Sequence, residues 1–243
     1  MTVDFYGPRL KVERAEQHIG ELEDIFAQYV RDNVKRLRGE TVPTFPKYIP
    51  TVLGDALHNL RAALDHAYHI VAEANCAVSS DRRQFPFGKH RQRLEDFIKK
   101  WKQQQITPSD KVIAAILDEI EPYEGGKLGL YGLHRLDITD KHTVLIPTVS
   151  TLHIEQLDYV DPTGAKHTGA IQGITIVGDQ SKGLEFIGVD GGGHTELQGD
   201  PKHAFAICFQ KGHPFEGDSI LATVRSLKTS TVKALDVLEE AAG

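Results

Sequence analysis

The pattern of the sequence changes near His142, and this change constrains the fold most. Before His142, apolar residues recur every three or four positions, as in amphipathic helices. After it come short β-prone runs, separated by turn signals such as Asp161-Pro162-Thr163-Gly164 and Gly178-Asp179. A helical pattern over residues 218–241 closes the chain. We therefore predict an α+β fold in which a helical-bundle half is followed by an antiparallel β-sheet and a C-terminal helix.

The expected elements follow from the spacing of apolar and turn-forming residues. Helices are predicted over residues 10–37, 51–74, 90–104, 107–121 and 128–141. Strands are predicted over residues 144–146, 152–159, 170–177, 184–189 and 204–209, in an antiparallel meander because their connections are short. We expect residues 1–146 to form a helical region and residues 147–243 a β region with its closing helix, packed together as one domain.

Length, charge and cysteine content narrow the class of protein. The chain has 243 residues, which suits one large domain, and a net charge of −6, which disfavours broad attraction to nucleic acid. No apolar run approaches the roughly 18 residues that span a bilayer, and the N-terminal segment lacks the apolar core of a signal peptide. Cys76 and Cys208 lack a CxxC spacing. We expect a cytoplasmic protein without a membrane partner.

The helical stretch Gly54–Ala74 carries more polar groups than packing alone requires. Its titratable and hydrogen-bonding residues are His58, Asn59, Arg61, Asp65, His66 and His69. Helical geometry places His58, Arg61 and Asp65 beside the leucine stripe, and Asn59 and His66 toward the opposite face. Buried polar groups are costly unless they have partners, so the first three residues predict a polar network.

The stretch 128–141 also carries polar residues beside its leucines. His134, Asp137 and Lys141 share one helical face with Leu130, at spacings of three and four. An Asp within hydrogen-bond reach of a His fixes the tautomer of its ring and raises its basicity. If the two helices pack together, their polar groups form one site. The candidate site residues are His58, Asn59, Arg61, Asp65, His66, His134, Asp137 and Lys141.

These residues allow three interpretations: a structural network, a metal site and a serine triad. The network can simply hold helices together. A transition metal is the alternative cofactor, with His58, His69 and His134 converging on Asp65 and Asp137, although HExxH and paired ExxH motifs are missing. A serine triad lacks its GxSxG turn. We predict no cofactor, with the metal as the alternative.

A basic segment lies outside both clusters. It contains Lys89-His90-Arg91-Gln92-Arg93 and, further on, Lys99, Lys100, Trp101 and Lys102. Such a run is typical of a solvated helix face. The other interpretation is a nucleic-acid contact, because Lys and Arg bind phosphates and Trp101 can stack on a base.

The segment Leu57–His66, LHNLRAALDH, resembles the LHNLRSALDH signature of a widespread group of uncharacterised bacterial proteins. The resemblance extends to Phe85-Pro86-Phe87, Glu121-Pro122-Tyr123, Leu133-His134-Arg135-Leu136-Asp137 and Asp140-Lys141-His142. It covers roughly residues 50–146 and implies no particular activity.

Arg61-x4-His66 also resembles the Rx4–6H motif of HEPN domains, which are small helical bundles, often dimeric, many of them metal-independent RNases. HEPN proteins usually carry a polar residue where this chain has Ala62, and the part after His142 lies outside that fold. The resemblance implies that Arg61 and His66 contact the scissile phosphate and assist attack by the ribose 2′-hydroxyl.

The leading functional hypothesis is therefore metal-independent cleavage of RNA by a homodimer. His66 acts as general base or acid, Arg61 stabilises the phosphorane charge, and Asn59 or Asp65 orients them. One alternative is a metal-dependent or small-molecule enzyme that uses the same clusters. The other is a non-catalytic binding or assembly protein.

Overall fold

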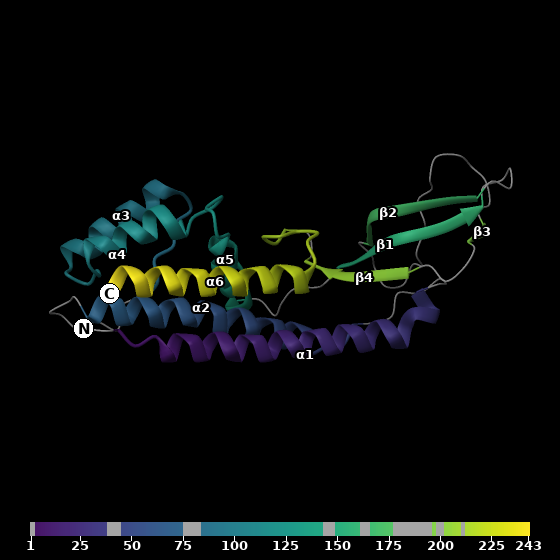
Figure 1. Cartoon of the computed structure of the whole chain (residues 1–243), viewed down its shortest axis with the longest axis horizontal. Coiled ribbons are helices and arrows are strands. Elements are labelled where there is room, and N and C mark those ends of the chain that lie inside the picture. Colours follow the sequence, from purple (N-terminus) through teal and green to yellow (C-terminus); the bar gives the residue numbers. More distant parts are fainter. Residues whose placement is uncertain are drawn as a thin grey trace. The chain divides into compact units, whose positions relative to one another are not determined.

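The computed structural model describes residues 3–37, 45–74, 84–142, 149–160, 166–176, 196–197, 202–209 and 212–243 (Figure 1). Its helices are α1 (Tyr6–Leu37), α2 (Ile49–Glu73), α3 (Arg91–Gln103), α4 (Asp110–Ala115), the π-helical turn η1 (Ile116–Ile120), α5 (Leu130–His142) and α6 (Ile220–Ala242). Its strands are β1 (Val149–Val160), β2 (Lys166–Ile176), β3 (Glu196–Leu197) and β4 (Lys202–Cys208).

The chain forms two compact units, and each of them joins separate stretches of sequence. The first unit combines Met1–Leu22, Pro50–Leu145 and Leu221–Gly243. The second combines Glu23–Ile49 and Ile146–Ile220. All candidate site residues belong to the first unit.

The first unit is helical, and its core consists of the apolar stripes that the sequence predicts. The stripe of α2 is fully buried, at Leu53, Leu57, Leu60, Leu64 and Val71. The stripe of α6 is buried as well, at Val224, Leu227, Leu235 and Leu238. Ion pairs join α6 to the beginning of α1: Arg9 with Asp236 and Glu239, and Lys228 with Glu16. Burial of these stripes is the main source of stability for the helices.

Local capping sets where the shorter helices begin and end. Ser109 accepts a hydrogen bond from the Val112 amide and opens α4. His90 does the same for α3 through the Arg93 amide. The π-helical turn ends at Glu121, whose φ is 51°, and Pro122 follows.

The second unit contains the four strands. β1 lies between its partners and pairs antiparallel with β2, β3 and β4. Thr151, for example, faces Thr175 on β2 and Ala206 on β4. The order β2-β1-β3, with β4 also on β1, is not the sequential meander that the short connections suggested.

The predicted fold class, an α+β chain with a helical half followed by a β half, is wrong. The described residues are mostly helical, with six α-helices among them. The C-terminal helix α6 packs in the helical unit with α2 and α5 instead of closing a β region. Extended propensity is a local property, and it did not show which runs pair or where the last helix packs. The predicted strands 144–146 and 184–189 lie outside the described residues.

No helix within the described ranges is long and apolar enough to cross a membrane.

Helices α2 and α5 approach each other closely at Gly54. A Cβ atom added there would lie 2.6 Å from both carboxylate oxygens of Asp140. Only a glycine lets the Asp140 carboxylate rest against the α2 backbone. This contact holds the two polar clusters together along the same pair of helices.

We expect Gly54→Ala to destabilise the protein by about 1–3 kcal/mol, because its new methyl group overlaps the Asp140 carboxylate. In an Asp140→Ala background the same change should stabilise by up to about 1 kcal/mol, because alanine favours helix more than glycine does. Urea unfolding of the four chains of this double-mutant cycle checks the change of sign. Equal effects of Gly54→Ala in both backgrounds would contradict the contact.

Candidate functional site

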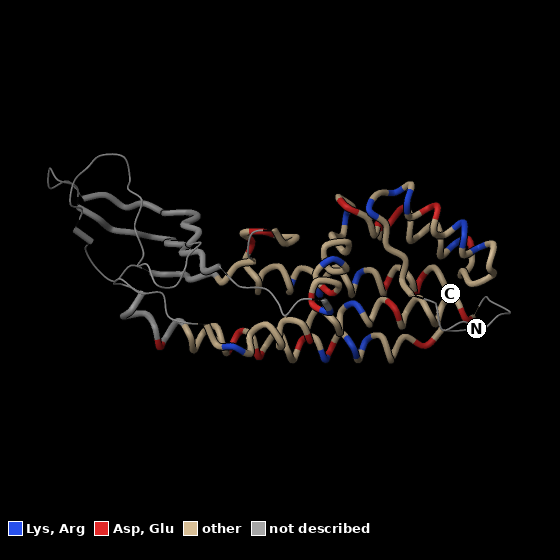
Figure 2. The backbone as a smooth tube through the Cα atoms, turned by 180° about the vertical axis from the view of Figure 1, so that it is seen from behind, with Lys and Arg blue, Asp and Glu red and all other residues tan. Residues whose placement is uncertain are grey.

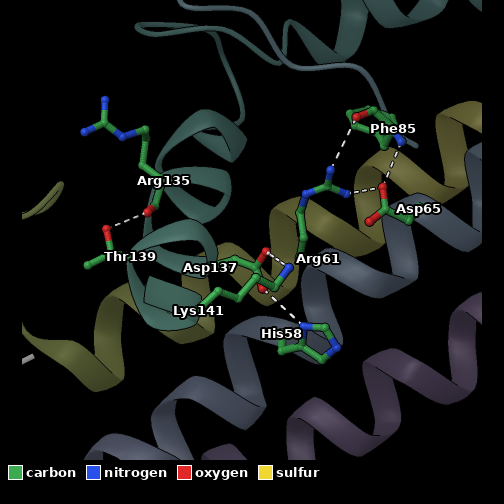
Figure 3. Close-up of polar contacts among 8 residues, drawn as sticks. All are labelled: His58, Arg61, Asp65, Phe85, Arg135, Asp137, Thr139 and Lys141. Atoms are coloured by element: carbon green, nitrogen blue, oxygen red, sulfur yellow. Dashed lines mark hydrogen bonds and ion pairs between the residues drawn. The ribbon is translucent and has the colours of Figure 1, made fainter. Parts of the chain in front are cut away.

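The site lies where α2 faces α5 and the segment 84–88 (Figure 3). His58 of α2 and Asp137 of α5 are in contact although 79 positions separate them in the sequence. The two polar clusters predicted from the sequence therefore meet in space. Figure 3 shows one oxygen of the Asp137 carboxylate joined to His58 and the other to Lys141.

Asp137 is the buried centre of this site. Its side chain is 3% exposed, whereas those of His58 and Lys141 are 54% and 50% exposed. One carboxylate oxygen lies 3.2 Å from His58 Nδ1, and the other accepts a hydrogen bond of 2.7 Å from Lys141 Nζ. A buried carboxylate needs such charged partners to remain ionised. Asp137 therefore orients His58 and Lys141, which both face solvent.

Asp140 adds a second carboxylate to the same region. Burial raises its pKa, and the nearby carboxylates of Asp137 and Asp55 raise it further. The sequence analysis did not select Asp140, because helical spacing alone does not reveal its contact with Gly54.

Arg61 and Asp65 fasten the segment 84–88 to α2. The Arg61 guanidinium is buried, forms an ion pair with Asp65 and donates a long hydrogen bond of 3.5 Å to the Phe85 carbonyl. Asp65 in turn accepts a hydrogen bond of 2.8 Å from the Phe85 amide. The guanidinium carbon also lies 4.5 Å from the centre of the Phe87 ring. Arg61 is thus held inside the protein by its contacts with Asp65, Phe85 and Phe87.

His134 lies on the other face of Phe87. The two rings are stacked, with centres 4.5 Å apart and planes 3° apart. The Nδ1 atom of His134 is buried and has no hydrogen-bond partner among the described residues. Burial lowers the pKa of His134 to about 4, and the positive charge of Arg61 lowers it in the same direction. His134 is therefore a neutral ring that packs, and its role differs from that of His58.

The remaining predicted residues lie apart from this network. Asn59 is bound to its own helix, since its amide donates to the Asp55 carbonyl at 2.8 Å. His66 is exposed on α2 and has no side-chain partner within the described ranges. His69 lies 3.5 Å from Glu73 at the surface. The structure thus brings together six of the eight candidates, at Asp137 and Phe87: His58, Arg61, Asp65, His134, Asp137 and Lys141.

The two phenylalanines are the main element that residue-type reasoning missed. Phe85 and Phe87 provide the carbonyl and the ring on which Arg61 and His134 rest. In the sequence they form the Phe85-Pro86-Phe87 motif, to which the residue pattern alone gave no role. Backbone bonds continue the anchor, because Gly88 donates to the Pro122 carbonyl at 3.2 Å and Glu124 to the Lys89 carbonyl at 3.3 Å.

In the part of the chain that the structure describes, no three His, Cys, Asp or Glu side chains converge in a way that could hold a metal ion. Comparison of the chain with protein-family models, with curated proteins and with solved structures gives no match. The function must therefore be argued from the site itself.

We expect Asp65→Ala to lower the free energy of unfolding by about 3 kcal/mol, because it leaves a buried guanidinium without its counter-charge and the Phe85 amide without an acceptor. Asp118→Ala is the matched control: it removes a carboxylate from Arg91 at the surface and should cost at most about 1 kcal/mol. Urea denaturation compares them. Equal small losses would mean that the Arg61 anchor contributes no stability.

The pKa of His134 predicts acid sensitivity. This pKa is about 4 in the folded protein, against an ordinary value of 6.5, so the unfolded chain takes up the proton first as the pH falls. The contribution of neutral His134 to the free energy of unfolding is intact above pH 6.5. It is lost progressively toward pH 4, by about 3 kcal/mol in all. His134→Phe keeps the stacked ring and should flatten this part of the stability profile, whereas His66→Gln should not. An equally steep profile for His134→Phe would refute the assignment.

Proposed function

We propose that this protein is an acid–base enzyme in which His58 is the reacting group, and that its reaction is metal-independent cleavage of RNA. One observation carries the proposal: an exposed imidazole is held at Nδ1, 3.2 Å from a buried carboxylate. Residues that only hold helices together have no need of a solvent-facing ring.

The geometry determines what His58 can do. When Nδ1 carries the proton and donates it to Asp137, Nε2 has a free lone pair that faces solvent. Imidazole is the side chain best suited to exchange protons near neutral pH, and the Asp137 carboxylate fixes the orientation of the His58 ring. His58 Nε2 is thus the proton acceptor of the proposed site.

Lys141 supplies positive charge beside this base. Its ammonium group donates one hydrogen bond to Asp137 and has two further N–H donors that can bind a substrate oxygen. A cation placed where negative charge develops is a common means of stabilising a transition state. Phosphodiester cleavage is one reaction that uses a base and a cation together.

The proposed reaction is an internal transesterification of RNA. His58 Nε2 accepts the proton of the ribose 2′-hydroxyl as O2′ attacks the phosphorus atom, and Lys141 offsets the charge on the phosphorane oxygens. The P–O5′ bond breaks, and O5′ takes a proton from solvent. The products are a 2′,3′-cyclic phosphate and a 5′-hydroxyl end. RNA is named as the substrate because its ribose 2′-hydroxyl supplies the nucleophile, so that the base His58 and the cation Lys141 suffice for the reaction.

The roles of Arg61 and His66 differ from those the HEPN resemblance implies. The Arg61 guanidinium is buried against Asp65 and Phe87, so we assign it a positioning role. His66 is exposed on α2, away from Asp137, and we assign it no part in the reaction.

Single substitutions separate these roles. We expect His58→Gln to reduce cleavage of single-stranded RNA by about 100-fold or more, because general base catalysis contributes that much. His66→Gln is the matched control, since it makes the same change about two turns further along α2, and should retain activity. Cleavage is measured on 2′-hydroxyl RNA in the presence of a chelator, with melting temperatures showing that both variants fold.

Loss of cleavage in His66→Gln with full activity in His58→Gln would overturn the proposal in favour of the Arg61/His66 pair. No cleavage by the unchanged protein would favour the second candidate, a non-catalytic binding or assembly protein. The buried Arg61–Asp65–Phe85 anchor supports that candidate, because those three residues only fasten one segment to another.

A further inference from the structure

The charge on α3 is unevenly compensated. Between residues 89 and 102 this segment has six cationic residues and two acidic ones, in a chain whose net charge is −6. Figure 2 shows Lys and Arg gathering along this helix. Its apolar face, with Leu94 and Ile98, is buried. The cations therefore lie on the two flanks and the outer face of the helix.

One flank of α3 is neutralised by neighbouring acids. Arg91 pairs with Asp118 at 2.7 Å and with Glu95 at 2.9 Å, and also donates to the Leu117 carbonyl. Hydrogen bonds to the Asp118 and Glu95 carboxylates raise the pKa of Arg91. Lys102 pairs with Asp110 at 2.5 Å. These two cations serve to hold α3 against α4 and η1.

The other flank is not neutralised. Arg93 and Lys100 are seven positions apart, so they lie along one side of the helix, with Lys99 next to Lys100 and Lys89 just before the helix begins. All four are exposed, and none has an acidic partner within the described ranges. Placing uncompensated cations in a row costs free energy through mutual repulsion. A polyanionic ligand relieves this repulsion.

Arg93 gives the flank an aromatic component. Its guanidinium carbon lies 4.5 Å from the centre of the Phe97 ring, so a flat cation is already ordered on a ring at the surface. Trp101, which the sequence offered as a stacking residue, instead contacts Tyr68 and Phe97, at ring-centre distances of 6.0 and 6.5 Å. Nucleobases stack on guanidinium planes as well as on aromatic rings.

We propose that the Lys89–Arg93–Lys100 flank of α3 binds single-stranded RNA, with the lysines on phosphates and Arg93 under a base. The choice of RNA among polyanions rests on the proposed function. The ordered Arg93–Phe97 pair favours a ligand with flat bases over an acidic peptide. The flank is then a binding surface separate from the residues that perform chemistry at His58.

The test compares two double variants that remove the same charge from the same helix. Arg93→Gln/Lys100→Gln changes the free flank, and Arg91→Gln/Lys102→Gln changes the neutralised one. Binding is followed by anisotropy of a fluorescein-labelled 2′-O-methyl oligouridine, which lacks the nucleophilic hydroxyl and cannot be cleaved. Melting temperatures verify that both full-length variants fold.

We expect the first variant to weaken binding about tenfold or more and to lower the salt slope by about 0.7, since each phosphate contact on a single strand contributes about 0.7 and Lys100 is the phosphate contact that this variant removes. The second variant should bind within about twofold of the unchanged protein, because its cations are already paired. Equal losses in both variants, no binding by the unchanged protein, or equal competition by polyglutamate would each overturn the inference.

The two proposals fail in different ways. If the free flank binds the oligouridine but ordinary RNA is never cleaved, the role of His58 is wrong and the binding surface stands. If ordinary RNA is cleaved and Arg93→Gln/Lys100→Gln leaves KM unchanged, the binding surface is wrong and the role of His58 stands. His58→Gln should bind the uncleavable probe as the unchanged protein does.

Discussion

The buried guanidinium of Arg61 is the interaction on which the arrangement of the site depends. It joins α2 to the segment 84–88 through Asp65 and the Phe85 carbonyl, and it lies against Phe87. Phe87 stacks on His134 and so reaches α5. A charge removed from water is stable only while its counter-charge and hydrogen bonds are in place, so this contact tolerates little displacement. The buried Arg61 guanidinium thus helps to fix the positions of α2 and α5.

This rigid arrangement separates structural histidines from reactive ones. His134 is stacked, largely buried and held neutral, whereas His58 stands half in solvent with one nitrogen on Asp137. Both come from the same kind of polar cluster beside a leucine stripe. Burial decides which of them exchanges protons with a substrate, because a ring shut away from water neither charges easily nor reaches a ligand.

On α3, ion pairing likewise distinguishes the cations that hold the fold together from those that are free to bind a ligand. Arg91 and Lys102 are used to attach α4 and η1, and their charges are cancelled there. Arg93 and Lys100 share the helix but have no such partner within the described residues. Net charge alone, which is negative, pointed away from nucleic acid. A local field depends on which charges remain unpaired, and pairing is a property of the folded chain.

The sequence by itself determined the helices and the faces they bury. Apolar spacing predicted the stripes of α2 and α6, because a periodicity of 3.6 residues reports which side of a helix leaves water. It also placed His58, Arg61 and Asp65 beside the α2 stripe. Periodicity says nothing about what a face meets, so the contacts from His58 to Asp137 and from Arg61 to Phe87 had to come from the tertiary structure.

The same limit explains the wrong fold class. Local propensity marked extended runs after His142, but the packing of α6 in one unit with α2 joins segments more than a hundred residues apart. Such contacts depend on how helices cross and on close approaches such as Gly54 against Asp140. The sequence decided which residues leave water, and the tertiary structure decided which of the buried and flanking groups meet, because pairing requires a distance that no spacing along the chain encodes.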